Sequence, residues 1–117
     1  MRLQRLYRIT VFVPPAHLQA LQDGICAVEP LGDARYAQVM WSSAPGVEQF
    51  LPLPGATPAQ GQVGVLSRLP TVRLEFAIPR DPQRLARVLR EGVRAHHPWE
   101  CPAIFIDETE QPVFDEE

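Results

Sequence analysis

The chain has 117 residues, of which 45% are hydrophobic and 21% charged, a composition typical of one folded domain spanning residues 1–117. Its formal net charge of -3 disfavours a general nucleic-acid binder, because neutralisation of phosphates by basic side chains dominates that affinity. Cys26 and Cys101 are too few for a secreted disulfide framework, and no apolar run reaches membrane-spanning length, so we expect a cytoplasmic protein without membrane association.

The N-terminal part of the chain predicts a strand followed by a helix. β-Branched and aromatic residues alternate along residues 6–13, which predicts a strand in the centre of a sheet. Pro14 and Pro15 then favour a helix start, where the missing N–H of a proline would have no intrahelical partner anyway. Apolar residues follow at spacings typical of one buried helical face: Leu18, Leu21, Ile25 and Val28.

The middle of the chain predicts two short strands and a long irregular segment. Residues 36–43 have the composition of a strand, a turn is expected at Pro45–Gly46, and residues 47–51 predict a short returning strand. Residues 52–64 predict a long excursion that projects from the edge of the sheet. Its spaced prolines and glycines are Pro52, Pro54, Gly55, Pro58, Gly61 and Gly64.

The C-terminal part repeats the order strand, helix, strand. Residues 72–78 alternate like a strand, and Asp81–Pro82 predicts a helix that ends near His96. The core stripe of this helix contains Leu85, Val88, Leu89 and Val93, and its opposite face carries Arg84, Arg87, Arg90 and Arg94. A short last strand over residues 103–106 precedes an acidic tail over about residues 107–117, which could neutralise the Arg face in the same or a neighbouring subunit.

Two strand-helix-strand halves predict an α+β fold, a ferredoxin-like βαβ-βαβ sandwich. The antiparallel sheet would carry two helices on one face and the long Gly/Pro-rich excursion between the halves. Its other face would remain uncovered. Since uncovered apolar sheet faces commonly mediate association, we expect a symmetric homo-oligomer.

A spaced pattern of aromatic, proline and glycine residues carries a resemblance to a known family. The pattern is Phe50-x-Pro52-x-x-Gly55-Ala56-x-Pro58-x-x-Gly61-x-x-Gly64, followed by Arg73-x-Glu75 and by His97-Pro98-Trp99-Glu100-x-Pro102. It resembles the insert domain of the Nif-three-like, YqfO-type family, which is similar to the PII and CutA folds. The resemblance covers nearly the whole chain, from Tyr7 to Ile106. It implies a PII/CutA-like fold and favours a homotrimer.

The chain departs from the family pattern in two ways. Trp99 stands where the family usually has a tyrosine, so a role that needs the phenolic hydroxyl is not carried over. The large flanking domains that hold the two-metal site of the family are absent from this sequence, as are the His and carboxylate residues that could rebuild it. We therefore expect a stand-alone version of the insert, and the resemblance transfers no hydrolase activity.

The segment from His96 to Pro102 concentrates side chains that could bind a ligand. Imidazole, carboxylate and thiolate groups are ligands of zinc and copper, so the metal candidates are His97, Glu100 and Cys101. His96 and Trp99 complete the ligand-binding candidates at this corner. In the structural interpretation, which we favour, the prolines stiffen a helix-to-strand crossing and Trp99 packs. Cys101 is then a small buried hydrophobic residue, and Glu100 bonds local backbone.

The excursion and the thiol offer weaker candidates. Gly55, Gly61 and Gly64 could let backbone N–H groups approach a ligand anion, but the Lys and Ser/Thr of a nucleotide-binding loop do not follow them, so a packed loop is favoured. A thiolate pair of Cys101 and His97 is the sole catalytic candidate, and we assign no catalytic residue.

These observations predict a non-enzymatic, homo-oligomeric binding, sensing or assembly module whose small-molecule or metal ligand is unidentified. The alternative is a small divalent-metal-binding protein that uses residues 96–101. A third hypothesis is a purely structural partner of a larger protein.

Overall fold

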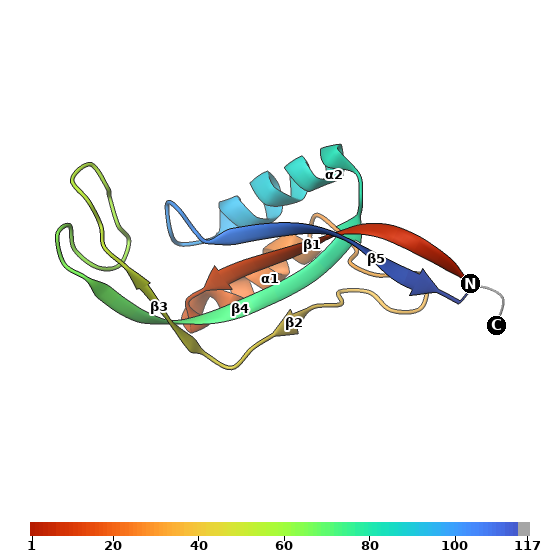
Figure 1. Cartoon of the computed structure of the whole chain (residues 1–117), viewed down its shortest axis with the longest axis horizontal. Helices are drawn as coiled ribbons and strands as arrows, with labels where there is room; N and C mark the ends of the chain where they lie inside the picture. Colours follow the sequence, from red (N-terminus) through yellow and green to blue (C-terminus); the bar gives the residue numbers. More distant parts are fainter. Residues whose placement is uncertain (115–117) are drawn as a thin grey trace.

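The computed structural model describes residues 1–114, which form a five-stranded sheet with helices on one face (Figure 1). Asp115, Glu116 and Glu117, the end of the predicted acidic tail, lie outside the described residues. The elements in chain order are β1 (Arg2–Val13), η1 (Pro15–His17), α1 (Leu18–Cys26), β2 (Trp41–Ser42), β3 (Gly46–Phe50), β4 (Ser67–Pro79), α2 (Pro82–Arg87), η2 (Val88–Val93), η3 (Arg94–His96) and β5 (Ile104–Val113).

The sheet has the strand order β2-β4-β1-β5, with β3 also paired to β4, and all its pairings are antiparallel. β1 therefore lies between β4 and β5, as predicted for a central strand. The order and the one-sided helices confirm the predicted α+β, ferredoxin-like fold. The second helix starts as predicted, since Asp81 accepts a hydrogen bond from the Gln83 N–H at 2.9 Å.

The core lies between the sheet and the helices. Buried residues of β1 and β4 stand opposite each other on the helix-covered face as Ile9 with Phe76, Val11 with Leu74 and Val13 with Val72. The helices add Leu21, Ile25, Val88 and Val93, which are 0% exposed. Burying each large apolar side chain contributes about 1.5–3 kcal/mol, so this layer is the main source of stability.

Two glycines let the helices approach closely. A Cβ on Gly24 would lie 2.3 Å from the His96 ring, and one on Gly92 would lie 3.3 Å from the Ile25 Cα. The Nδ1 of His96 is 2.9 Å from the Gly92 carbonyl oxygen. His96, a ligand candidate in the sequence, therefore lies against Gly24 of α1, although it remains exposed at the surface.

The predicted strand over residues 36–43 is wrong for most of its length, since β2 covers only Trp41–Ser42. Asp33 instead closes a turn, because its carboxylate accepts hydrogen bonds from two backbone N–H groups of the turn at 2.7 and 3.0 Å. Gln38 then has a left-handed φ of 60°, which interrupts the extended chain.

The turn predicted at Pro45–Gly46 does not reverse the chain. Both β2 and β3 run antiparallel to β4, with Trp41 opposite Glu75 and Gly46 opposite Thr71, so they are two pieces of one interrupted edge strand. The reversal occurs in residues 51–66, which we call the loop. The loop caps a long β3–β4 hairpin at one end of the molecule (Figure 1).

The last strand is longer than predicted, because β5 continues to Val113 through most of the expected acidic tail. In the register with β1, Arg5 lies opposite Glu110 and Arg8 opposite Asp107. Cross-strand pairs of opposite charge contribute about 0.2–1 kcal/mol each. The acidic residues Asp107, Glu108 and Glu110 therefore extend a strand rather than forming a separate tail.

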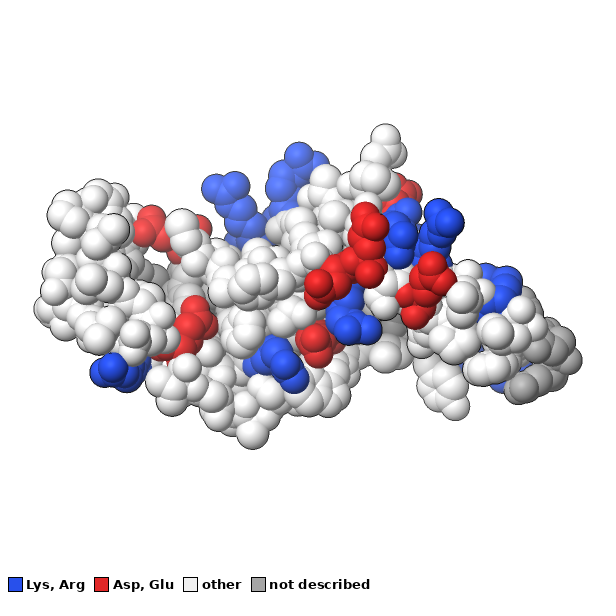
Figure 2. Space-filling model, viewed as in Figure 1, with Lys and Arg blue, Asp and Glu red and all other residues white. Residues whose placement is uncertain are grey.

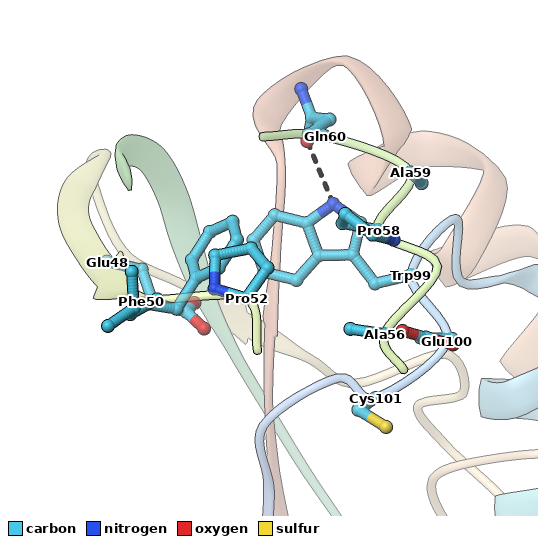
Figure 3. Close-up of a pocket in the computed structure, with 11 residues that line it drawn as sticks. Glu48, Phe50, Pro52, Ala56, Pro58, Ala59, Gln60, Trp99, Glu100 and Cys101 are labelled. Atoms are coloured by element: carbon cyan, nitrogen blue, oxygen red, sulfur yellow. Dashed lines mark hydrogen bonds between the residues drawn. The ribbon is translucent and has the colours of Figure 1, made fainter. Parts of the chain in front are cut away.

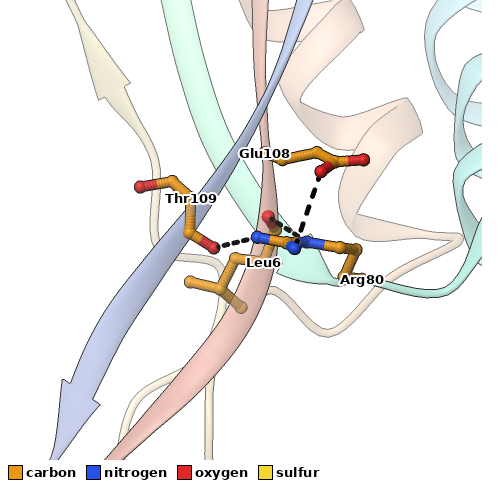
Figure 4. A network of polar contacts seen from close by, with 4 residues as sticks. All are labelled: Leu6, Arg80, Glu108 and Thr109. Atoms are coloured by element: carbon orange, nitrogen blue, oxygen red, sulfur yellow. Dashed lines mark hydrogen bonds and ion pairs between the residues drawn. The ribbon is translucent and has the colours of Figure 1, made fainter.

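Arg80, just after β4, ties β1 to β5 (Figure 4). Its Nε donates to the Leu6 carbonyl at 3.3 Å, its Nη2 donates to the Thr109 carbonyl at 2.7 Å, and its Nη1 lies 3.6 Å from a Glu108 carboxylate oxygen. Hydrogen bonds to charged groups contribute about 1.5–3 kcal/mol each when they are shielded from water. This anchor helps to hold the acidic segment against the sheet.

Two residues of the Arg face of the second helix pair with carboxylates that lie outside the predicted tail. Arg84 donates to both carboxylate oxygens of the buried Glu29, at 3.0 and 2.5 Å, and Arg87 pairs with Glu91 at 3.0 Å.

No helix within residues 1–114 is long and apolar enough to cross a membrane.

Candidate functional site

The candidate site lies where the loop meets residues 96–102, which we call the corner. The corner leads from η3 into β5, and the loop joins β3 to β4. Hydrogen bonds join Thr57 and Gln60 of the loop to Glu100 and Trp99 of the corner. The fold thus brings together two of the segments that the sequence singled out, although about 40 residues separate them.

His97 is buried and makes a hydrogen bond through each ring nitrogen. Its Nδ1 accepts from the Trp99 N–H at 3.1 Å, so the ring proton lies on Nε2, which donates to the Phe12 carbonyl at 2.8 Å. Burial lowers the pKa of His97, against the opposing effect of the Phe12 bond, and His17 lowers it further. A neutral His97 therefore fixes the start of the corner to the end of β1.

Trp99 carries the contact between the corner and the loop. Its ring centroid lies 5.5 Å from that of Phe50 and 5.7 Å from that of His97, both at tilted angles. Its Nε1 donates to the Gln60 side-chain oxygen at 2.8 Å (Figure 3). The indole therefore supplies both apolar contact and a polar link, which is a typical use of tryptophan.

Glu100 holds the loop through Thr57. One carboxylate oxygen accepts from the Thr57 N–H at 2.9 Å, and the other accepts from the Thr57 hydroxyl at 2.7 Å. These bonds lower the pKa of Glu100, the hydroxyl more than the N–H. The expected bond from Glu100 to backbone is present, but its partner is distant in sequence rather than local.

The three candidate glycines serve the shape of the loop. Gly55, Gly61 and Gly64 have positive φ values of 101°, 86° and 81°, a conformation that L side chains rarely adopt. The Gly64 N–H donates to the Pro52 carbonyl at 2.8 Å. None of the three is among the residues that line the pocket between the loop and the corner.

That pocket has a volume of about 200 Å³ (Figure 3). It is lined by Glu48, Phe50, Leu51, Pro52, Ala56, Pro58, Ala59, Gln60, Trp99, Glu100 and Cys101. Sequence reasoning named the last three as candidates but missed Glu48 and Gln60. Alternation along residues 46–50 places Glu48 on the same face as Phe50, a signal that could have found it.

No group of three or more His, Cys, Asp or Glu side chains within residues 1–114 could hold a metal ion. Both nitrogens of His97 are engaged with Phe12 and Trp99, so neither is directed at Cys101. Cys101 is exposed, so the prediction that it is a buried hydrophobic residue is wrong. The thiolate pair is therefore not formed. Zinc or copper binding by His97, Glu100 and Cys101 stays a prediction that needs rearrangement or groups from a second copy.

Comparisons with known proteins identify relatives in mycobacteria. A protein named GTP cyclohydrolase 1 type 2 homolog from Mycobacterium leprae is 32% identical over 98 residues, and the protein of the same name from Mycobacterium tuberculosis is 36% identical over 98 residues. Each match covers 82% of this chain and 24% of the relative, so the chain spans about a quarter of the length of these relatives. No family model matches the chain.

Solved structures agree with these relatives. A Bacillus cereus protein related to NIF3 superimposes with a TM-score of 0.73 and 23% identity, over 93% of this chain and 27% of that protein. The divalent ion tolerance protein CutA1 from Ehrlichia chaffeensis has a TM-score of 0.62 and 8% identity, over 97% of this chain and 88% of that protein. The chain is therefore a Nif-three-like, PII/CutA-like domain, similar to about a quarter of each of these longer relatives.

Proposed function

We propose that the chain is a homo-oligomeric binding and assembly module whose copies meet through the helix-free face of the sheet. The observation that carries this proposal is the exposure of large aromatic side chains on that face, since Trp41 is 50% and Phe105 58% exposed. In register, Thr10 lies opposite both Glu75 and Phe105, and Glu75 lies opposite Trp41. Opposite residues share a face, so both aromatic residues lie on the side away from the core.

The charges of this face favour another copy as its partner. Arg73 stacks on Trp41, with its guanidinium carbon 4.9 Å from the ring centroid, and Thr10 donates to Glu75 at 3.2 Å. Basic and acidic side chains are interspersed on the visible surface (Figure 2). A face that carries both signs is suited to a symmetric contact with itself and poorly suited to a polyanion. The family resemblance favours a trimer.

In such an assembly the loop and the corner lie at the end of the sheet, beyond the aromatic residues of the proposed contact. Their pocket is the binding part of the proposed module. Proline-rich walls and the Glu100 and Trp99 links hold it in shape, which reduces the entropy cost of binding.

The test is the native mass of the protein, purified without chelator, measured together with light scattering over a range of concentrations. We expect an oligomer for the wild type, a monomer for Phe105→Glu, and an unchanged oligomer for Leu53→Glu, which adds the same charge at a 63% exposed loop position. A monomeric wild type would contradict the proposal. A Phe105→Glu oligomer would exclude this face as the contact, and the same spectrum reports any retained metal ion.

A further inference from the structure

The pocket between the loop and the corner is small and largely apolar. Phe50 and Pro52 lie on one side of the Trp99 ring, and Pro58 lies beside it (Figure 3). Its volume of about 200 Å³ is below the roughly 300–1,000 Å³ of sites for drug-sized ligands. Its occupant is therefore a single chemical group or a very small molecule.

The charge of the pocket has one sign. Two carboxylates, Glu48 and Glu100, line it, and no Arg, Lys or His is among the lining residues. Figure 2 shows acidic side chains between the loop end and the rest of the molecule. An anionic ligand would be repelled here, whereas a cation would be attracted.

The two carboxylates differ in their hydrogen bonding. Both oxygens of Glu100 accept bonds from Thr57. In contrast, Oε1 of Glu48 is buried and is the one buried side-chain oxygen or nitrogen in residues 1–114 without a hydrogen-bond partner. A buried carboxylate oxygen without a donor costs free energy, so a ligand donor that reached this oxygen of the pocket-lining Glu48 would be stabilising.

We propose that the pocket binds a guanidinium group, with Glu48 as its hydrogen-bond acceptor and counter-ion. A guanidinium is planar, weakly hydrated and rich in N–H donors, and it packs well against aromatic walls such as those of Phe50 and Trp99. The group could belong to a free small molecule or to an arginine side chain of a peptide. The inference deepens the binding part of the proposed function and does not depend on the contact between copies.

Other ligand classes fit less well. A metal ion would need three or more protein ligands, and no such cluster exists among the described residues. A neutral ligand would leave the charge of Glu48 without compensation. A guanidinium satisfies the charge, the missing donor and the apolar walls together.

The experiment is a titration of ¹⁵N-labelled protein, followed through the indole N–H signals of the chain's two tryptophans. The probes are N-acetyl-arginine amide, as a peptide side chain, and agmatine, as a free small molecule. We expect saturable shifts of the Trp99 signal, with Trp41 on the proposed contact face as an internal reference that does not move. N-acetyl-citrulline amide, a neutral molecule of nearly the same shape, should bind at least about tenfold more weakly.

Two variants test the role of Glu48. Glu48→Gln should weaken binding of the arginine probe by about tenfold or more, with a spectrum that otherwise remains folded. Glu91→Gln removes the same charge from the exposed face of η2 and should leave binding unchanged. Both variants should keep the native mass of the wild type, so failure of this inference is distinguishable from failure of the oligomer.

The outcomes are decisive in both directions. Binding of the arginine probe alone supports a peptide side chain as the source, and binding of agmatine alone supports a free small molecule. Equal binding of the citrulline probe, unchanged binding by Glu48→Gln, or no shift of the Trp99 signal with either cation would overturn the proposal.

Discussion

The helix-packed body of the protein and its loop end are held together by different interactions. In the body, apolar side chains such as Leu21, Ile25 and Leu74 are 0% exposed. At the loop end, the main links to the rest of the chain are hydrogen bonds from Glu100 and Trp99 to loop residues, plus the Phe50–Trp99 ring contact. Because burial carries most of the folding free energy, the body can remain folded when the loop is released.

This difference separates residues that maintain the fold from residues that shape the pocket. His97 lies at the boundary, since it is buried against β1 and also holds the backbone of Trp99. Substitutions in the body should destabilise the whole fold, those at His97 should affect both regions, and those at Glu100 should affect the loop alone.

The largest effect is expected in the body. Leu21→Ala removes a side chain that is 0% exposed and leaves a cavity, so the free energy of unfolding should fall by about 2–5 kcal/mol in urea denaturation. Leu53→Ala, at a 63% exposed position of the loop, is the control and should change the free energy of unfolding by less than about 0.5 kcal/mol. Similar losses for the two variants would contradict the separation of body and loop.

A smaller, pH-dependent effect is expected at the boundary. The pKa of His97 is lowered in the folded state, so below the unfolded value of about 6.5 the unfolded chain binds more protons than the folded one. The stabilising contribution of neutral His97 is therefore complete above about pH 6.5 and is lost as the pH falls through the lowered pKa.

The matched variant for this prediction is His97→Phe, which keeps a flat ring but cannot titrate. At pH 7.5 it should be less stable by about 1–3 kcal/mol, because the Trp99 N–H and the Phe12 carbonyl lose their partner. Its stability should also change less than that of the wild type between pH 7 and pH 5 in denaturant titrations. Parallel pH curves for the two proteins would show that His97 does not titrate as its burial predicts.

The sequence predicts a strand or helix of this protein correctly where the residues that determine it lie within that element. The strand at residues 72–78 was predicted correctly from the alternation of apolar residues, and the helix that begins at Pro82 from the Asp81–Pro82 pair. Both signals act within a few residues of the chain. The extension of β5 was missed, since its acidic residues lie opposite Arg5 and Arg8 of β1 and Glu108 pairs with Arg80, all of which are distant in sequence. Composition alone cannot indicate such partners.

At the candidate site, too, the decisive contacts join residues that are distant in sequence. The corner residues form a group in the sequence because they are adjacent in the chain, but their partners Thr57, Gln60 and Phe12 could not be predicted, because the fold alone brings them together. The unpaired oxygen of Glu48 likewise becomes visible only when the loop and the corner are both in place. The sequence therefore indicated the corner as a candidate, and the tertiary contacts add the groups that surround it.

The smallest effect on global stability is expected at the loop end, where Glu100→Gln tests the comparison directly. The amide retains the shape of the side chain, but it loses the charge that strengthens the bonds from the Thr57 N–H and hydroxyl. Hydrogen exchange at the Thr57 amide should become faster, while the denaturation midpoint stays at the wild-type value. The wild type should also show faster exchange at the Thr57 amide at acidic pH. Since the pKa of Glu100 is lowered in the folded state, its stabilising charge is fully present above about pH 4.5 and is lost as the pH falls through the lowered pKa.

Glu91→Gln is the control, since it makes the same change in charge at an exposed position of η2 and should leave exchange at Thr57 unchanged. If Glu100→Gln lowers the denaturation midpoint as much as Leu21→Ala does, the loop is part of the cooperative unit and the two regions are not separate. If Thr57 remains protected in Glu100→Gln, the Trp99–Gln60 bond and the Phe50–Trp99 contact are sufficient to hold the loop, and the pocket is more rigid than the Glu100 contacts alone imply.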